Sequence, residues 1–223
     1  MRNDKDAAIA LRKDGKSYRE ICKILKIPKS TLNGWLSGIK WSQEIKKRLS
    51  EIALENARVR MKEMARQAGN DRLKLYQQKR IIAGQKFKKF KQEKLFISGL
   101  MIYRGEGDSN LKNGAIRVAN TDPLMLRLFH VFLKKYLSEI SDKAKAYLVL
   151  YPDLNDEVCR KFWSEQIGVP LEKFIKSQYI KGRHPTKRLS YGVCTIIITS
   201  RAYKEMINAW IELIKKDIQL MRV

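Results

Sequence analysis

The feature that most limits the fold of this chain is a change of pattern near residue 94. Before that point apolar residues recur at helical spacing and strand-like alternation is almost absent. After it, strand-like runs at 115–119, 146–150 and 195–199 are separated by helical stretches. We therefore expect an all-α N-terminal part and an α+β part over residues 95–223.

Basic charge is concentrated in the helical part. The 223 residues carry 47 Lys and Arg against 23 Asp and Glu, a net charge of +24. Residues 1–94 hold 26 of the basic and 10 of the acidic residues, a net +16, which leaves +8 for residues 95–223. Such self-repulsion is typical of a protein that binds a polyanion, and double-stranded DNA is the partner we expect.

Composition also bears on the compartment and on metals. No apolar run approaches the roughly 20 residues of a membrane span, and the first residues lack the apolar core of a signal peptide. Cys22, Cys159 and Cys194 are odd in number and far apart, so we expect a reducing cytoplasm (the nucleoid, in a bacterium) and no disulfide framework. Since only His130 and His184 accompany them, a zinc site is not expected. His130 lies among apolar residues and is interpreted as a core residue.

Residues 1–40 have the pattern of a small helical DNA-binding domain. Ser17 and Glu20 have capping-box spacing at the start of a helix, and Pro28 breaks that helix before the next one begins. The stretch Lys16–Leu36 resembles the helix-turn-helix of resolvases and transposases. The alternative is a three-helix bundle without a ligand.

In a helix-turn-helix the first side chains of the second helix reach the bases and phosphates of the major groove. Asn33 can pair bidentately with adenine, whereas Lys29 suits a phosphate. The candidate contacts are Lys29, Ser30, Thr31 and Asn33.

Residues 41–94 are interpreted as a basic helical connector. The pattern predicts one helix over 42–67, a break at Gly69-Asn70, and a second helix from 71 that Gly84 divides. The connector either lies along the DNA backbone or pairs with its copy in a dimer. Phe87 and Phe90 alternate with lysines, and packing onto the domain is favoured over stacking on single-stranded bases.

The segment Leu95–Asp108 (LFISGLMIYRGEGD) predicts an apolar helix that ends in Gly-Glu-Gly-Asp. The helix dipole disfavours a carboxylate at Glu106, so this residue calls for a compensating partner, and a divalent cation is one candidate. The alternatives are a solvated helix end or an ion pair with Arg104 or a lysine. Ser98 and Gly105 on one face would let a second helix approach.

This segment resembles the motif of LAGLIDADG homing endonucleases, with residues 99–107 (GLMIYRGEG) on its nine positions. The resemblance covers roughly residues 95–216 and implies a homodimer paired through the 95–107 helix. It also implies catalytic Mg²⁺ bound beside DNA at Glu106 and the adjoining Gly105. Asp108 is either an outer ligand or, more simply, a loop cap for Asn110.

The segments 174–181 and 190–199 predict a two-stranded ribbon that faces the major groove and carries a basic loop. Lys187 is also our candidate for charge stabilisation near a scissile phosphate. The alternative is a loop whose charge only keeps it soluble. The candidate DNA contacts are Lys176, Gln178, Lys181, Arg183, Lys187 and Arg188.

The sequence thus predicts a helix-turn-helix domain (1–40), a helical connector (41–94) and a LAGLIDADG-like α+β domain (95–223). The expected function is sequence-specific DNA binding with Mg²⁺-dependent cleavage by a homodimer. The alternative is a transcriptional regulator that keeps the fold without cleavage, because Arg104 and Met101 depart from the motif. A three-carboxylate transposase is disfavoured because no acidic set stands out.

Overall fold

The computed structural model describes residues 4–108, 110–180 and 189–220. It forms two compact units, residues 1–71 and residues 72–223. Unit 1 is entirely helical in its described part, whereas unit 2 contains a four-stranded sheet with helices around it. The predicted division into a helical N-terminal part and an α+β C-terminal part is confirmed at this level.

Unit 1 contains α1 (Lys5–Lys13), α2 (Tyr18–Leu25), α3 (Lys29–Leu36) and the first part of α4 (Lys40–Phe90). The Ser17 side chain accepts the N–H of Glu20, and the Glu20 carboxylate accepts the N–H of Ser17, so the predicted capping box is confirmed. A small apolar core holds the helices together, and it consists of Ala8, Ile21, Ile27, Leu32 and Leu36.

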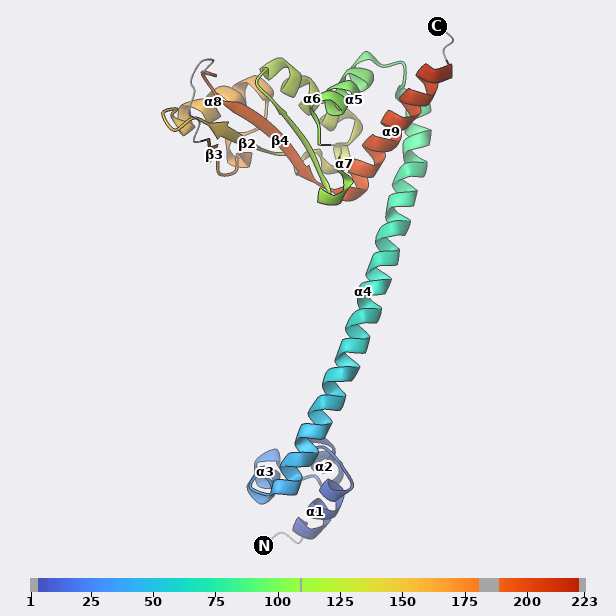
Figure 1. Cartoon of the computed structure of the whole chain (residues 1–223), viewed down its shortest axis with the longest axis vertical. Coiled ribbons are helices and arrows are strands. Elements are labelled where there is room, and N and C mark those ends of the chain that lie inside the picture. The colour runs from blue at the N-terminus through green and yellow to red at the C-terminus, as the bar shows by residue number, and fades with distance from the viewer. Residues whose placement is uncertain (1–3, 109, 181–188, 221–223) are drawn as a thin grey trace. The chain divides into compact units, whose positions relative to one another are not determined.

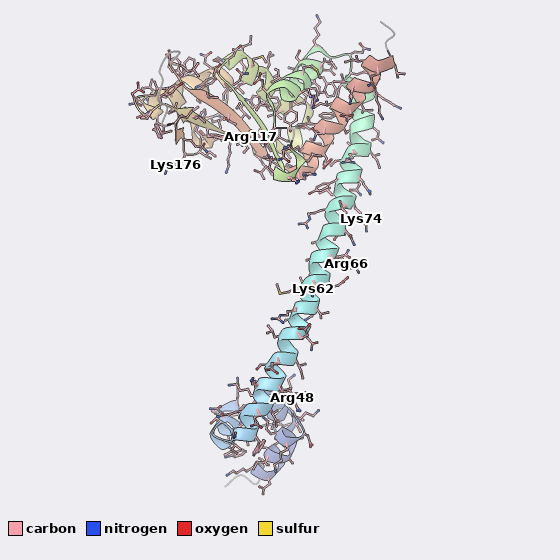
Figure 2. The ribbon with its side chains drawn as sticks, viewed as in Figure 1. Arg48, Lys62, Arg66, Lys74, Arg117 and Lys176 are labelled. Carbon is pink, nitrogen blue, oxygen red and sulfur yellow. The ribbon has the colours of Figure 1, made fainter. Side chains whose placement is uncertain are left out.

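The helix α4 runs without interruption through Gly69-Asn70 and Gly84, so the predicted breaks are wrong. A glycine in a helix interior costs only about 1 kcal/mol relative to alanine, and strong helix formers on both sides offset it. Ion pairs such as Arg66–Glu63 at 2.9 Å add support along the exposed helix surface. Between residues 51 and 68 nearly every side chain is exposed, and Figure 2 shows Lys62 and Arg66 projecting from this stretch.

The sheet of unit 2 consists of β1 (Ala115–Asn120), β2 (Lys145–Leu150), β3 (Gln178–Tyr179) and β4 (Val193–Thr199), in the order β1-β4-β2-β3. The strand β4 is antiparallel to both β1 and β2, whereas β3 pairs with β2 in parallel. The strand-like runs expected at 115–119, 146–150 and 195–199 are therefore confirmed.

The predicted two-stranded ribbon is wrong, because β3 and β4 do not pair but lie on opposite sides of β2. The segment before β3 follows the outer edge of β2, where Phe174 is buried and bridges Ala146. The strand β4 carries apolar β-branched residues on both faces, and this composition suits an interior strand better than one arm of an exposed ribbon.

Helices cover one face of the sheet and leave the other open (Figure 1). Ile116, Val118, Leu148 and Ile196 point into the covered face and are fully buried, whereas alternate residues such as Arg117 lie on the open face. The helices are α5 (Lys94–Glu106), α6 (Pro123–Tyr136), α7 (Ser138–Ser141), α8 (Asp156–Ile167) and α9 (Arg201–Leu220), with short 3₁₀ turns at Leu111–Asn113 and Leu171–Lys173.

The centre of the unit 2 core is an aromatic cluster around Phe96 of α5. The Phe96 ring lies 5.0 Å from Tyr136 and 5.1 Å from Trp210 between centroids, in edge-on geometry. Phe87 and Phe90 at the end of α4 pack on the same ring at 6.2 Å and 5.8 Å. Packing, rather than base stacking, is therefore the role of these two phenylalanines.

Two polar side chains, one just before α6 and one within it, are engaged in hydrogen bonds. The Asp122 carboxylate caps the helix by accepting the N–H of Leu124 at 2.8 Å. His130 is buried, and its Nδ1 lies 2.9 Å from the carbonyl oxygen of Ile167, so the ring nitrogen donates there. Burial lowers the pKa of His130. The core interpretation of His130 is confirmed.

Candidate nucleic-acid interface

The helix α3 turns its apolar side inward and its polar side to solvent. Leu32 and Leu36 are fully buried against α1 and α2. Because these two residues anchor the helix, Lys29, Ser30 and Asn33 lie on its exposed side, and Thr31 is half-buried at the edge. The predicted candidate contacts therefore occupy the first turn and a half of the second helix of the motif.

The surface around α3 is strongly basic. From Lys16 to Lys40 the chain carries six basic residues and one acidic residue, Glu20, whose carboxylate is engaged in the α2 cap. Hydrogen bonding to Ser17 keeps the pKa of Glu20 below its ordinary value. Such a surface is suited to double-stranded DNA, because the basic side chains can contact phosphates while the polar side of the helix faces the bases.

In unit 2, Glu106 is the last residue of α5, as predicted, and its side chain is exposed, like Gly105. It borders a recess of about 440 Å³ over the open face of the sheet. The chain turns sharply after it, since Gly107 pairs with Val118 of β1 and a Cβ at Gly107 would lie 2.2 Å from the carbonyl oxygen of Tyr103. The recess is lined by residues 106–108 of the helix end, Arg117 and Ala119 of β1, Tyr147 and Val149 of β2, and Val193 and Thr195 of β4.

Asp108 is engaged by several donors. Its carboxylate accepts the N–H of Asn110 at 2.9 Å, the Asn113 amide and Arg117 Nη2 at 2.9 Å. Burial acts to raise the pKa of Asp108, but these bonds and the charges of Lys204 and Arg117 outweigh it, so the pKa lies below its ordinary value. The loop-capping role towards Asn110 is confirmed, and the outer metal-ligand role stays a prediction.

Sequence reasoning missed Lys204, which is 0% exposed. Its Nζ donates to the carbonyl oxygen of Asn110 at 2.7 Å and to Asn113 Oδ1 at 2.8 Å, so α9 holds the loop that follows Glu106. Desolvation lowers the pKa of Lys204, and nearby Asp108 opposes that shift. A signal was present, because Lys204 stands in one helical stripe with Ile207, Ile211 and Ile214. A lysine on such a stripe requires buried acceptors.

The predicted Mg²⁺ site has few protein ligands within one chain. Among residues 4–108, 110–180 and 189–220, no group of three or more His, Cys, Asp or Glu side chains is placed to hold a metal ion. Mg²⁺ at phosphate-cleaving sites is commonly held by one or two carboxylates together with waters and substrate phosphates. An exposed Glu106 beside an open sheet face fits that kind of site only when DNA and a second carboxylate complete it.

Of the DNA contacts predicted around β3, the structure describes two. Lys176 and Gln178 are both exposed beside or within β3, and Figure 2 shows Lys176 at the surface of unit 2. Lys181, Arg183, Lys187 and Arg188 lie outside the described residues. The structure therefore brings Glu106 together with Arg117 and Asp108, and it does not relate Glu106 to the candidate Lys187.

Comparisons of the chain with family models, with curated proteins and with solved structures give no match. Within the part of the chain that the structure describes, no helix is long and apolar enough to cross a membrane. The three cysteines are free thiols.

Proposed function

We propose that the chain is a sequence-specific double-stranded DNA-binding protein in which α3 reads bases from the major groove. The observation that carries this proposal is the exposed polar side of α3 within a basic surface. Ser30 and Asn33 supply hydrogen-bonding groups there, and Lys29 supplies a charge for a phosphate. The net charge of +24 supplies the general attraction to DNA.

Selection from a pool of random duplexes tests this proposal. We expect the full chain to enrich a defined site, and its affinity for that site to fall steeply with salt because bound Lys and Arg release counterions. Equal recovery of all sequences would refute base reading by α3. A shallow salt dependence would refute DNA binding altogether.

A second candidate is Mg²⁺-dependent cleavage by a homodimer of the LAGLIDADG kind, and the position of Glu106 favours it. The carboxylate is exposed at the end of α5 over an open sheet face, where a duplex has access. The exposed side of α5 carries Ser98, Met101 and Gly105, on which a second copy would bring a second Glu106 close by. The engagement of Asp108 favours the alternative regulator, because Glu106 is then the other carboxylate that remains for a metal among the described residues that line the recess.

A plasmid carrying the selected site separates these two functions. In Mg²⁺ the endonuclease would nick or linearise the plasmid, and Ca²⁺ would support binding without turnover. Glu106→Gln should abolish cleavage and retain binding, whereas Glu165→Gln, an exposed control on α8, should keep both. A sharp gel shift with intact plasmid from every variant would identify the regulator.

A further inference from the structure

Unit 1 contains a groove of about 690 Å³ between the exposed side of α3 and the first turns of α4. Lys29 and Asn33 line it from α3, and Lys46 and Ser50 line it from α4. Two of the candidate base and phosphate contacts therefore also border this groove. A ligand that contacts Lys29 and Asn33 from within the groove would therefore also lie beside α4.

A side-chain hydrogen bond joins the start of α4 to the end of α3. Gln43 Nε2 donates to the carbonyl oxygen of Ser37 at 2.9 Å, which ties the first turns of α4 to the end of α3. Ser50 Oγ donates to the carbonyl oxygen of Lys46 at 2.9 Å and is satisfied within the helix. Among the described residues of α4 that line the groove, Lys46 is therefore the charged side chain that can meet an occupant.

The inner wall of the groove contains a buried cation, Arg12, which is 2% exposed. Its guanidinium donates to Ser42 Oγ at 3.2 Å, to the Ser42 carbonyl oxygen at 2.8 Å and to the Lys16 carbonyl oxygen at 2.8 Å, and it lies over the ring of Tyr18. All these partners are neutral, and no ion pair joins Arg12 to a carboxylate within the described residues.

Three positive charges thus face one groove without a carboxylate among the described residues that line it. A buried cation with only neutral hydrogen-bond partners keeps part of its desolvation cost, and an anion in the groove would lower that cost for Arg12. The groove adjoins the base-reading side of α3, so the anion that fits is the phosphate backbone of the strand that α3 reads.

We propose that this groove binds the DNA backbone, with Lys46 of α4 as a phosphate contact opposite Lys29 and with Arg12 supplying positive charge from the wall. This inference rests on the proposed DNA binding and adds α4 to the interface of unit 1. The sequence pattern of α4 is compatible with two roles, contact with DNA and dimerisation. This inference assigns DNA contact to the start of the helix.

Lys46→Ala in the full chain tests the proposal, with Lys47→Ala as the matched control. Both changes remove one exposed positive charge, but Lys47 is turned about 100° around the helix from Lys46 and does not line the groove. One lost phosphate contact should lower the slope of log K against log salt by about one. A counterion slope of about 0.9 per contact corresponds to roughly fivefold weaker binding at 0.15 M salt.

Fluorescence anisotropy with the selected duplex at several salt concentrations gives both quantities. We expect Lys46→Ala to show the full loss, Lys46→Arg to restore affinity and Lys47→Ala to weaken binding less than twofold. A neutral methylphosphonate at the contacted phosphate should then weaken the wild-type complex and leave the Lys46→Ala complex unchanged.

The outcomes separate this inference from the function on which it rests. Equal losses from Lys46→Ala and Lys47→Ala, in a wild type with a steep salt slope, would overturn the groove site and leave DNA binding intact. A shallow slope in the wild type would overturn both.

Discussion

The close approach of α5 and α6 at Gly99 makes a sharp prediction about the stability of unit 2. A Cβ built on Gly99 would lie 2.3 Å from Phe132 Cγ and 2.4 Å from Phe132 Cδ2. Carbon atoms in contact are normally 3.5–4.0 Å apart, so the ring would have to move by roughly 1 Å. Gly84 of α4 is also a helical residue of unit 2, but a Cβ there meets nothing within 4 Å. The effects of Gly→Ala on stability at the two positions should therefore differ mainly because the new Cβ meets Phe132 at one position and no neighbour at the other.

The expected magnitudes follow from these contacts. Phe132 is fully buried and contacts other rings, among them Phe129 at 5.9 Å and Tyr136 at 5.4 Å between centroids, so it has little room to move. Overpacking of a core lowers the free energy of unfolding by about 1–3 kcal/mol, and we expect a value near the upper end because Phe132 cannot move away easily. Helix propensity returns about 1 kcal/mol for Gly→Ala. We expect Gly99→Ala to lower the unfolding free energy by about 2 kcal/mol, and Gly84→Ala to raise it by about 0.5–1 kcal/mol.

Urea unfolding of the full chain measures both variants. Trp35 and Trp41 belong to unit 1, whereas Trp163 and Trp210 report on unit 2. Replacing the first two by Phe in every protein makes tryptophan fluorescence a probe of unit 2 alone. A Gly99→Ala protein as stable as its parent would refute the close helix contact and, with it, the placement of the α5 end that carries Glu106.

Three further predictions concern the interface, the pH response and the core. Asn33→Ala should relax discrimination at one base position by about 1–3 kcal/mol, measured as the ratio of affinities for the selected site and its single-base variants; unchanged ratios would exclude Asn33 from base reading. Burial lowers the pKa of His130, so the unfolded chain takes up a proton below about pH 6.5 that the folded chain resists, and stability should fall as the pH drops through that value. Urea titrations from pH 7 to 5 should give a flatter curve for His130→Gln, and identical curves would assign the proton uptake to another group. The Glu205 carboxylate is 3% exposed and accepts hydrogen bonds from Arg80. Glu205→Ala should therefore lower the free energy of unfolding by about 2–3 kcal/mol. This is less than the usual loss for a buried ion pair, because the Arg80 side chain can turn to water. Thermal unfolding of the exposed control Glu212→Ala should match the wild type, and an equal loss from both would contradict this account.

The sequence predicted those parts of the fold that depend on neighbours along the chain. The capping box at Ser17 and the strand-like runs at 115–119, 146–150 and 195–199 follow from local patterns, and the structure confirms each of them. The break predicted at Gly69 failed because a local penalty of about 1 kcal/mol does not interrupt a helix with favourable residues on both sides. The ribbon failed because the partner of β3 is β2, which lies well upstream in the sequence.

In the candidate sites too, the features that depend on local sequence could be predicted, whereas the contacts between distant residues could not. The exposed side of α3 and the position of Glu106 at a helix end follow from periodicity and from the glycines around residue 106. The contact of Lys204 with the loop at Asn110 joins residues that are 94 positions apart, and that of Arg12 with Ser42 spans 30 positions. Local periodicity cannot specify contacts of this length, although a lysine within an apolar helical stripe does indicate that buried acceptors exist.

The central place of β4 in the sheet has a consequence for aggregation. Its sequence, VCTIIIT, is apolar, uncharged, rich in β-branched residues and free of proline, and such segments form cross-β structure readily when exposed. In the native sheet β1 and β2 pair with its two edges. The outer edge of β1 is in turn met by Gly107 at Val118, and β3 at the other side of the sheet is only two residues long. The aggregation-prone strand is therefore released only when the sheet itself opens, so a change that weakens the sheet also reduces the solubility of the protein.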